Sequence, residues 1–464
     1  MSLPVHRLEP GLLAALATGG GAPAVRWLAG VRRSRTMLLV RAVRDLAAGV
    51  GHAEARLASD GYAALARIHR VAPAAVEALL AAPAVGAWAA TTAAALAGAA
   101  PAARSRSAGA DAGSAYVPGL TCTASPGRLA SVATAAALRG GVPLLLALPT
   151  DGRAPLPLPD LGTAVLPEHA GLEFRSDGRQ AELRGGRHVL RLPARLGQPA
   201  PGWYPTPRVE VEHRGRTLRV TLGSLEPGSL EPGSLDGDPA CGELLVDWWR
   251  RRLEAGWRLL VRHHTRVAEE VATAIRMVVP LGASPGVLHS ITHRDAFGCV
   301  AMTPPPSARW VALTLAHEVQ HAKLSALDDV VPLTQPDCGA RFYAPWRDDG
   351  RPVACLLHGL YAHVGVAGFW RRQRRHEPPG KERFHAEVEY VRWREACMAV
   401  VDTLRASQLL TRAGTQFVAA LERVLHGWAA DPVPAAAVTA ADAEADRHHA
   451  SALGRASWPS AGNR

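Results

Sequence analysis

Two histidines and a glutamate stand together in the sequence as His317, Glu318 and His321, within the pentapeptide His-Glu-Val-Gln-His. Side chains four residues apart lie on the same face of an α-helix, so the two imidazoles can bind one metal ion. Glu318 is rotated by roughly 100° from His317 on a helix of about 3.6 residues per turn, which suits proton transfer better than ligation. The pentapeptide predicts a metal site with Glu318 as its catalytic residue.

The surrounding residues predict a helix over 306–329. Three prolines and Ser307 precede the pentapeptide and form a helix start signal. Apolar residues then follow at helical spacing: Trp310, Leu313, Leu324 and Leu327. Such a helix presents both histidines on one face.

A third ligand must come from another segment. Leu324 and Leu327 stand where metzincin-type peptidases have a glycine and a third histidine, so that class is excluded. Thermolysin-like enzymes use a later glutamate, and the candidates here all lie in a strongly charged stretch: Glu377, Glu382, Glu387 and Glu389.

The segment Leu-Leu-His-Gly-Leu-Tyr-Ala-His, residues 356–363, offers two further histidines. His358 shares a predicted helix face with the small residues Ala354 and Gly365, which would let a second helix and a metal approach closely. A ligand or an ordinary packed histidine both fit this position. His363 falls on a different face, where a packed core histidine is the expected role.

Three histidines with an open coordination position suit either zinc hydrolysis or non-haem iron oxygen chemistry. With zinc, Glu318 would act as the general base on a metal-bound water. With iron, Glu318 would stand beside the ligands, and an anionic cosubstrate would need an arginine partner. The spacing of the histidines does not choose between the two.

The composition excludes some classes of function. The formal net charge of the 464 residues is +11, but it is carried almost wholly by arginine, with lysine only at 323 and 381. Basic residues are not clustered with aromatic residues as a nucleic-acid groove requires. The densest basic run could simply cap a helix C-terminus: Arg371, Arg372, Arg374 and Arg375.

Cellular location follows from the cysteines and the apolar segments. The six cysteines lie far apart and no secretory signal precedes them, so reduced thiols in a cytoplasmic protein are expected. The uncharged stretch 79–103 is mostly alanine, with prolines near its ends, and a packed helix is expected rather than a membrane span.

The pattern along the chain predicts a mostly α-helical α+β protein with a small antiparallel sheet. Length favours two or three domains. Strands are expected at 142–149, within 161–222, at 277–281 and at 299–302, and the later helices are expected at 244–275, 306–329, 352–375 and 383–428. The expected divisions are an N-terminal helical region 1–103, a linker and β-rich region 104–240, a helical catalytic domain 241–430 and a disordered tail 431–464.

Four segments together are similar to the HExxH-type 2-oxoglutarate- and Fe(II)-dependent peptide β-hydroxylases of ribosomal peptide biosynthesis. They are Thr-Leu-Ala-His-Glu-Val-Gln-His-Ala-Lys-Leu-Ser-Ala-Leu-Asp-Asp-Val-Val-Pro-Leu at 314–333, Tyr-Ala-Pro-Trp-Arg-Asp-Asp-Gly-Arg-Pro at 343–352, the 356–363 segment, and Arg-Asp-Ala-Phe-Gly at 294–298. The resemblance covers residues 240–430 and, more loosely, the N-terminal half. No Cys-rich radical-SAM motif is present, so the chain resembles a stand-alone member.

The resemblance implies an enzyme that uses Fe(II), O2 and 2-oxoglutarate to hydroxylate the β-carbon of a residue, often Asp or His, in a precursor peptide. His317 and His321 match the metal pair, and His358 matches the third ligand. Arg347 and Arg351 are the candidates for binding 2-oxoglutarate, with surface ion pairs to nearby aspartates as the alternative. Implied partners are the precursor peptide and a partner maturase, without nucleic acid or membrane.

Tyr361, one helical turn from His358, is predicted to line the substrate cavity, with a plain core position as the alternative. Two other functions stay open. A zinc metallopeptidase would use Glu318 as general base, and a non-catalytic, metal-stabilised module would bind a peptide without turnover.

Overall fold

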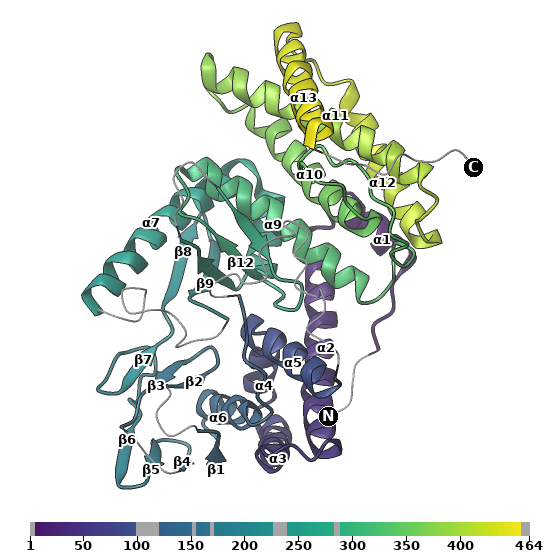
Figure 1. The fold of residues 1–464 in the computed structure, drawn as a ribbon. Helices are drawn as coiled ribbons and strands as arrows, with labels where there is room; N and C mark the ends of the chain where they lie inside the picture. Colours follow the sequence, from purple (N-terminus) through teal and green to yellow (C-terminus); the bar gives the residue numbers. More distant parts are fainter. Residues whose placement is uncertain are drawn as a thin grey trace. The chain divides into compact units, whose positions relative to one another are not determined.

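The computed structural model describes six stretches of the chain: 5–98, 120–150, 155–167, 171–225, 239–282 and 288–455. The fold is α+β, with helices dominant and small sheets, as predicted (Figure 1). Two compact units are formed, and each combines distant parts of the sequence. Unit 1 comprises Met1–His6, Ala29–Glu254 and Ile275–Pro306, whereas unit 2 comprises Arg7–Leu28, Ala255–Ala274 and Ser307–Arg464.

This division does not follow the linear segments expected from the sequence. Helix α1 (Pro10–Ala17) belongs to unit 2, far along the chain from the other helices of that unit. The unit boundaries fall within α2 (Gly21–Gly49) and α7 (Pro239–His263). The expected linker at 104–115 and most of the Gly-Ser-Leu-Glu-Pro repeat lie outside the described residues.

Unit 1 has a core in which helices pack with two small antiparallel sheets. The helices after α2 are α3 (Ala55–Val71), α4 (Pro73–Leu80), α5 (Pro83–Leu96) and α6 (Arg128–Gly140). One sheet has the order β1-β4-β5-β6, from Leu144–Leu148, Leu172–Ser176, Ala181–Gly185 and His188–Arg191. The other has the order β2-β3-β7, from Leu156–Leu158, Gly162–Ala164 and Trp203–Pro205. Buried Leu and Ala side chains from helices and strands meet in one cluster.

A five-stranded sheet completes unit 1, in the order β11-β12-β10-β9-β8. Its strands are Ser290–Thr292, Cys299–Met302, Met277–Pro280, Arg216–Leu222 and Arg208–His213. The predicted hairpin is confirmed, and its turn residues Arg214 (φ 49) and Gly215 (φ 73) have the positive φ angles of a type I′ turn. The predicted strands at 277–281 and 299–302 also form, as β10 and β12, and β10 pairs in parallel with both β9 and β12, a pairing that the sequence did not predict.

Unit 2 is helical in its described part. Its helices after α1 are α8 (Thr265–Ala274), α9 (Ala308–Asp328), α10 (Val353–Gln373), α11 (Lys381–Ala406), α12 (Arg412–Ala429) and α13 (Ala435–Arg455). Two predicted long helices are broken. The first ends as α7 and resumes after His264 as α8, and the second is interrupted before Thr411, whose hydroxyl caps α12 by accepting from the Gly414 N–H at 3.0 Å.

The C-terminal segment corrects one prediction. We expected a disordered tail over 431–464, but α13 forms over Ala435–Arg455 and lies along α11 (Figure 1), whereas residues 456–464 lie outside the described stretches. Ala437 and Ala441, one helical turn apart, pack against Val388 and Val391 of α11. Small side chains at this spacing allow a close contact between the two helices. The alanine-rich composition, which we interpreted as a sign of disorder, is what permits this contact.

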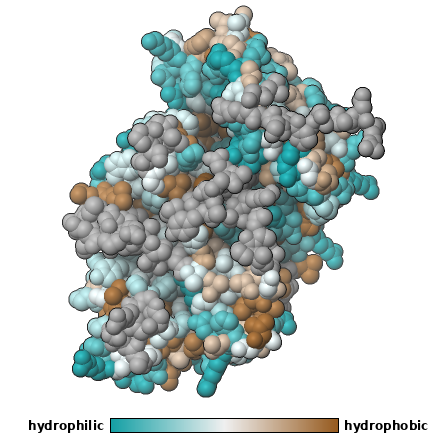
Figure 2. All heavy atoms as spheres, viewed as in Figure 1, coloured by the Kyte–Doolittle hydropathy of each residue, from teal (hydrophilic) through white to brown (hydrophobic). Residues whose placement is uncertain are grey.

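Helix α10 is long and apolar enough to cross a membrane, but 72% of its most apolar window is buried within the protein. Helices α4 and α5 pass the same test only as a pair and are bent by 69°. On the face drawn in Figure 2, apolar side chains lie in small groups between hydrophilic ones. Burial of this kind is typical of a helix in a protein core.

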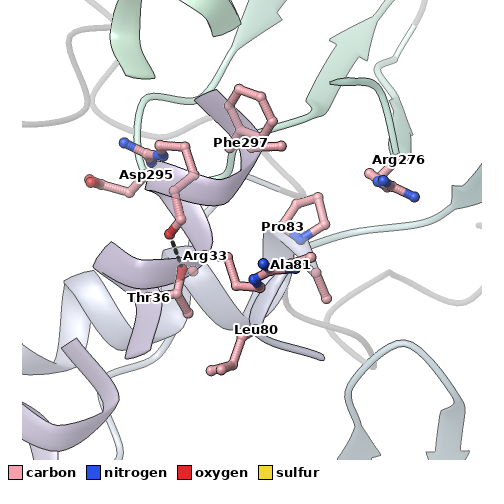
Figure 3. Close-up of a pocket in the computed structure, with 12 residues that line it drawn as sticks. Arg33, Thr36, Leu80, Ala81, Pro83, Arg276, Asp295 and Phe297 are labelled. Carbon is pink, nitrogen blue, oxygen red and sulfur yellow. Dashed lines mark hydrogen bonds between the residues drawn. The ribbon is translucent and has the colours of Figure 1, made fainter. Parts of the chain in front are cut away.

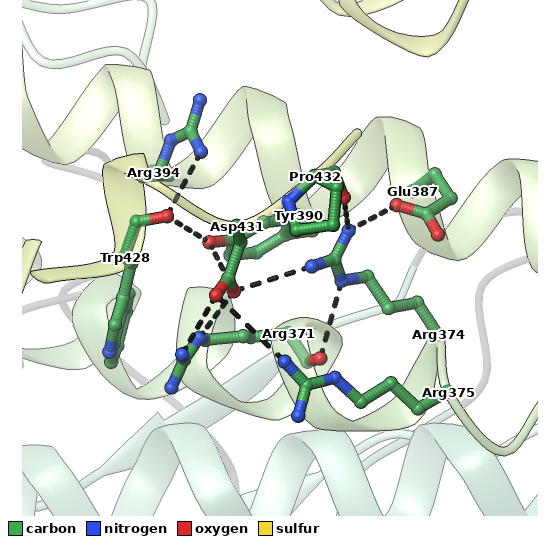
Figure 4. Close-up of polar contacts among 9 residues, drawn as sticks. All are labelled: Arg371, Arg374, Arg375, Glu387, Tyr390, Arg394, Trp428, Asp431 and Pro432. Atoms are coloured by element: carbon green, nitrogen blue, oxygen red, sulfur yellow. Dashed lines mark hydrogen bonds and ion pairs between the residues drawn. The ribbon is translucent and has the colours of Figure 1, made fainter. Parts of the chain in front are cut away.

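Asp431, just after α12, ties three helices of unit 2 together (Figure 4). Arg371 of α10 donates to both carboxylate oxygens, at 2.6 and 2.9 Å, and Tyr390 of α11 donates its hydroxyl at 3.0 Å. Arg374 adds a contact at 3.3 Å. The hydrogen bond from Arg371 is the main reason that the pKa of Asp431 falls from 3.8 to about 2.

We expect Asp431→Asn to lower the free energy of unfolding by about 1–2 kcal/mol at pH 7, after allowance for partial solvent screening. Because the folded pKa is depressed, the stabilisation is present above pH ~4 and is lost as the pH falls to ~2. Urea unfolding measured from pH 6 to 2 should show this acid-dependent loss in the wild type and a smaller one in the variant. Asp402→Asn, at an exposed position of α11, is the matched control, and an equal effect there would contradict the prediction.

Candidate metal centre

Helix α9 positions the histidine pair. Ser307 is its N-cap and accepts from the Trp310 N–H at 3.3 Å, which confirms the predicted helix start. Most of α9 from Leu315 to Leu327 is buried. His321 is 6% exposed, whereas the His317 side chain keeps 22% of its surface accessible. One histidine therefore belongs to the core of unit 2 and the other lies at its edge.

The two imidazoles face each other through their Nε2 atoms, which are 3.1 Å apart. Neutral imidazoles can share one proton across this distance. The distance also suits two ligands of one ion, because metal–nitrogen bonds of about 2.0–2.1 Å place such atoms roughly 2.9–3.3 Å apart at bond angles of 90–109°. Burial lowers the pKa of both histidines, that of His321 strongly, so both are neutral and available as ligands at pH 7.

Glu318 is buried beside this pair, with 1% of its surface exposed. Its Oε1 atom lies 4.0 Å from the Nε2 atom of His317, which is too far for a hydrogen bond. The carboxylate is thus near the point where the two imidazoles converge. The catalytic role of Glu318 stays a prediction.

Helix α10 approaches α9 closely at Gly365. A Cβ atom there would be 2.8 Å from Gln320 Cγ and 3.3 Å from the Ala316 carbonyl oxygen, so a larger residue would push the helices apart. The close approach predicted from the small residues of this segment is confirmed at this glycine. It brings the two histidines of α10 beside the pair on α9.

His358 is held by a carboxylate at the end of α9. Its Nε2 atom is 2.8 Å from Asp328 Oδ2, and its ring is nearly parallel to that of His321, with centroids 6.2 Å apart. The Nδ1 atoms of His358 and His321 are both buried and have no hydrogen-bond partner. A carboxylate on one imidazole nitrogen and a bare second nitrogen are usual for metal-ligating histidines.

His363 also belongs to this cluster, which the sequence did not predict. Its ring lies 5.2 Å from that of His317 between centroids, and its Nδ1–H donates to the Gly359 carbonyl at 2.8 Å. That bond leaves Nε2 as the unprotonated nitrogen. Burial, followed by the charge of His317, lowers the pKa of His363 to about 3. His363 is packed, as expected, but it is packed against the site.

Two tryptophans enclose His363. Trp346 stacks on its ring at 4.4 Å with an interplanar angle of 11°, and Trp393 of α11 lies at 4.5 Å. Gly359 permits the stacking, because a Cβ atom there would be 2.2 Å from the Trp346 ring. The glycine four residues before His363 is the sequence feature that could have indicated this arrangement.

The four histidines form a cluster around one converging pair: His317, His321, His358 and His363. Within the described stretches, no three His, Cys, Asp or Glu side chains converge closely enough to hold a metal ion. The donor types nevertheless fit a divalent metal, because two Nε2 atoms already meet and a buried His358 nitrogen nearby is unpaired. Completing a three-histidine site requires one α10 side chain to turn inward.

Arg347 and Arg351 share one partner. Arg347 Nε donates to Asp349 Oδ1 at 3.0 Å, and Arg351 Nη1 donates to Oδ2 of the same carboxylate at 3.2 Å. Both arginine side chains are largely buried, 15% and 11% exposed. Arg347 follows Trp346 directly in the chain, so the backbone connects the arginine pair to the tryptophan that stacks on His363. Two guanidinium groups on one carboxylate show that the segment can hold a carboxylate between them.

Tyr361 corrects a further prediction. We expected it to line the cavity, but its ring is in the core, 2% exposed, and its hydroxyl donates to the Leu16 carbonyl at 2.6 Å. Its ring also packs against Phe417. Tyr361 therefore fixes α10 within unit 2, and we assign it no substrate contact.

Comparison with known proteins adds nothing to these residues: no family model matches the chain, and no curated protein is similar to it in sequence.

Proposed function

We propose that the chain is an Fe(II)- and 2-oxoglutarate-dependent hydroxylase that acts on a residue of a peptide. The observation that carries a metal site is the pair of Nε2 atoms, 3.1 Å apart, on a buried helix next to Glu318. The choice of iron and 2-oxoglutarate is supported by the resemblance of four segments to the HExxH-type peptide β-hydroxylases. These segments are 294–298, 314–333, 343–352 and 356–363.

Each residue of the cluster has a proposed task. His317 and His321 would hold the metal, with His358 or His363 as third ligand. Bound Fe(II) would supply oxygen activation driven by oxidation of 2-oxoglutarate. Glu318 would hold a proton next to the ligands, and the Trp346 ring would exclude water from the His363 side.

Arg347 and Arg351 are proposed to bind a cosubstrate carboxylate. Both arginines donate to Asp349 in the structure. The cosubstrate carboxylate would therefore either displace the Asp349 carboxylate or bind beside it. Arginine suits the task because its planar guanidinium matches a carboxylate in a bidentate contact.

A zinc metallopeptidase is the second candidate, favoured by one observation. The Glu318 carboxylate lies 4.0 Å from His317 Nε2, and a metallopeptidase would need a general base beside its metal ligands. A peptidase would require Glu318 for cleavage, whereas a non-catalytic peptide-binding module would keep its partner after Glu318→Gln.

The test uses the full chain purified anaerobically, loaded with Fe(II) or Zn(II), and then given O2, 2-oxoglutarate and the peptide encoded beside its gene. Peptide-stimulated succinate and a mass gain of one oxygen support the proposal. Shortened peptide with zinc and no succinate overturns it in favour of the peptidase. Metal-dependent peptide binding without either product overturns both enzyme assignments.

A further inference from the structure

A hollow in unit 1 is lined by arginines from separate elements. Arg32 and Arg33 come from α2, and Arg276 comes from the residue before β10. The α4–α5 junction at residues 80–83 and the Phe297 ring complete much of the lining (Figure 3). The sequence separation of these elements means that the fold, and not a local basic run, gathers the charges.

Hydrogen bonds hold the segments that carry these arginines. Arg32 is 5% exposed, and its Nη2 donates to the Arg294 carbonyl at 2.6 Å. Around Arg276, the backbone N–H donates to the Gly298 carbonyl and the carbonyl accepts from the Thr221 N–H, both at 2.9 Å. These contacts fix the Arg32 side chain and the backbone of Arg276, so the segments that bear the exposed Arg33 and Arg276 side chains need little rearrangement on binding.

Positive charge exceeds negative charge around the hollow. Asp295, the one carboxylate in the described lining, is already paired with Arg35 at 2.7 Å. Arg33 is paired with Glu77 at 3.2 Å, but both side chains are more than 40% exposed. Such exposed pairs contribute little and exchange readily. Arg276 is exposed and has no carboxylate partner among the described residues.

The helix end at the hollow adds to this charge. Helix α5 begins at Pro83, its N-cap Ala82 offers no side-chain cap, and its first turn has no acidic residue. Gly86 allows the approach of α5 to the 294–297 loop, because a Cβ atom there would lie 2.8 Å from the Asp295 carbonyl oxygen. The positive end of the helix dipole therefore borders a hollow that already has guanidinium groups.

We propose that this hollow binds the oxyanion group of a small molecule, a carboxylate or a phosphate, between Arg33 and Arg276. Guanidinium groups pair with both groups through two parallel hydrogen bonds. The Phe297 ring and Pro83 provide an apolar surface for the carbon part of such a ligand. The site is in unit 1 and is independent of the proposed chemistry at the histidine cluster in unit 2.

The test titrates the full chain with inorganic phosphate, and separately with acetate, by calorimetry at constant ionic strength set with chloride. Saturable binding of either probe, weakened about tenfold or more in Arg33→Gln/Arg276→Gln, supports the site. Phosphate binding alone identifies a phosphate ligand, and acetate binding identifies a carboxylate ligand. Arg219→Gln, which changes an exposed arginine paired with Glu210 elsewhere in unit 1, is the matched control and should bind as the wild type does.

A gain-of-binding variant separates this site from a folding effect. Glu77→Gln removes the carboxylate that competes for Arg33, so it should tighten binding several-fold without touching the lining. No saturation with either probe, equal binding in the double arginine variant, or weaker binding in Glu77→Gln would each overturn the proposal.

Discussion

Replacing His321 with alanine is expected to abolish stoichiometric metal binding. His321 is the most buried of the pair, and its Nε2 atom is one of the two that meet at 3.1 Å. Loss of groups that only support a ligand weakens metal affinity by about 10–100-fold, so loss of a ligand itself should exceed about 100-fold. Anaerobic titration with Fe(II) and with Zn(II) measures this, with metal content of the purified protein as a second readout.

The same titration identifies the third ligand. We predicted His358, and the structure adds His363 as a competitor, since each keeps one nitrogen bound and the other available. His358→Ala and His363→Ala should differ, with the larger loss marking the ligand. His426→Ala, at an exposed position of α12, is the control and should leave binding unchanged. Full metal binding in His321→Ala would show that the pentapeptide is not a metal site.

Local sequence patterns predicted the elements well where one segment decides its own structure. The β8–β9 hairpin follows from alternating residues around Arg214 and Gly215, and both adopt the positive φ angles that such a short turn needs. Ser307 begins α9 as predicted because its hydroxyl can replace a missing backbone partner. In these cases the information lies within a few residues.

Local patterns did not predict the features that distant segments decide. The parallel pairing of β10 depends on two strands from different parts of the chain, and no periodicity encodes it. His363 was assigned to a different helix face from His358, and that is correct for an isolated helix. The cluster arises because α9, Trp346 and Trp393 meet α10 on both faces, which is tertiary information.

A buried ion pair on the metal helix gives the largest expected effect on stability. Lys323 of α9 and Glu270 of α8 are 2.7 Å apart, and their side chains are 1% and 3% exposed. Lys323 also donates to the Gly19 carbonyl at 3.1 Å, and Glu270 accepts from the Gly21 N–H at 2.8 Å. Burial lowers the pKa of Lys323, but Tyr361 and Glu270 outweigh it, so the net shift is upward and the lysine stays charged.

The glycines explain how the chain reaches this pair. Gly19, Gly20 and Gly21 have φ angles of 107°, 70° and 70°, which residues with a Cβ adopt only at a cost. The turn they form directs the Gly19 carbonyl toward Lys323 and the Gly21 N–H toward Glu270. The N-terminal segment of unit 2 is thereby fastened to α9, two residues beyond His321.

Lys323→Met should lower the free energy of unfolding by about 3–5 kcal/mol, because it leaves the Glu270 charge buried without a counterion. Lys323→Met/Glu270→Leu should recover much of that loss, since an apolar pair of similar volume costs little to bury. Urea unfolding at pH 7 measures both. Lys381→Met, which changes the only other lysine at an exposed position, should be nearly neutral.

A double variant that is less stable than Lys323→Met alone would contradict this account, because independent sites add their losses whereas a coupled pair does not. The comparison also bears on the metal site. If the double variant folds as stably as the wild type but binds metal less tightly, the ion pair holds the histidines in position in addition to stabilising the fold. An unchanged metal affinity in the double variant would limit the role of Lys323 to stability. In that case the buried apolar contacts of α9 alone would hold His317 and His321 in position.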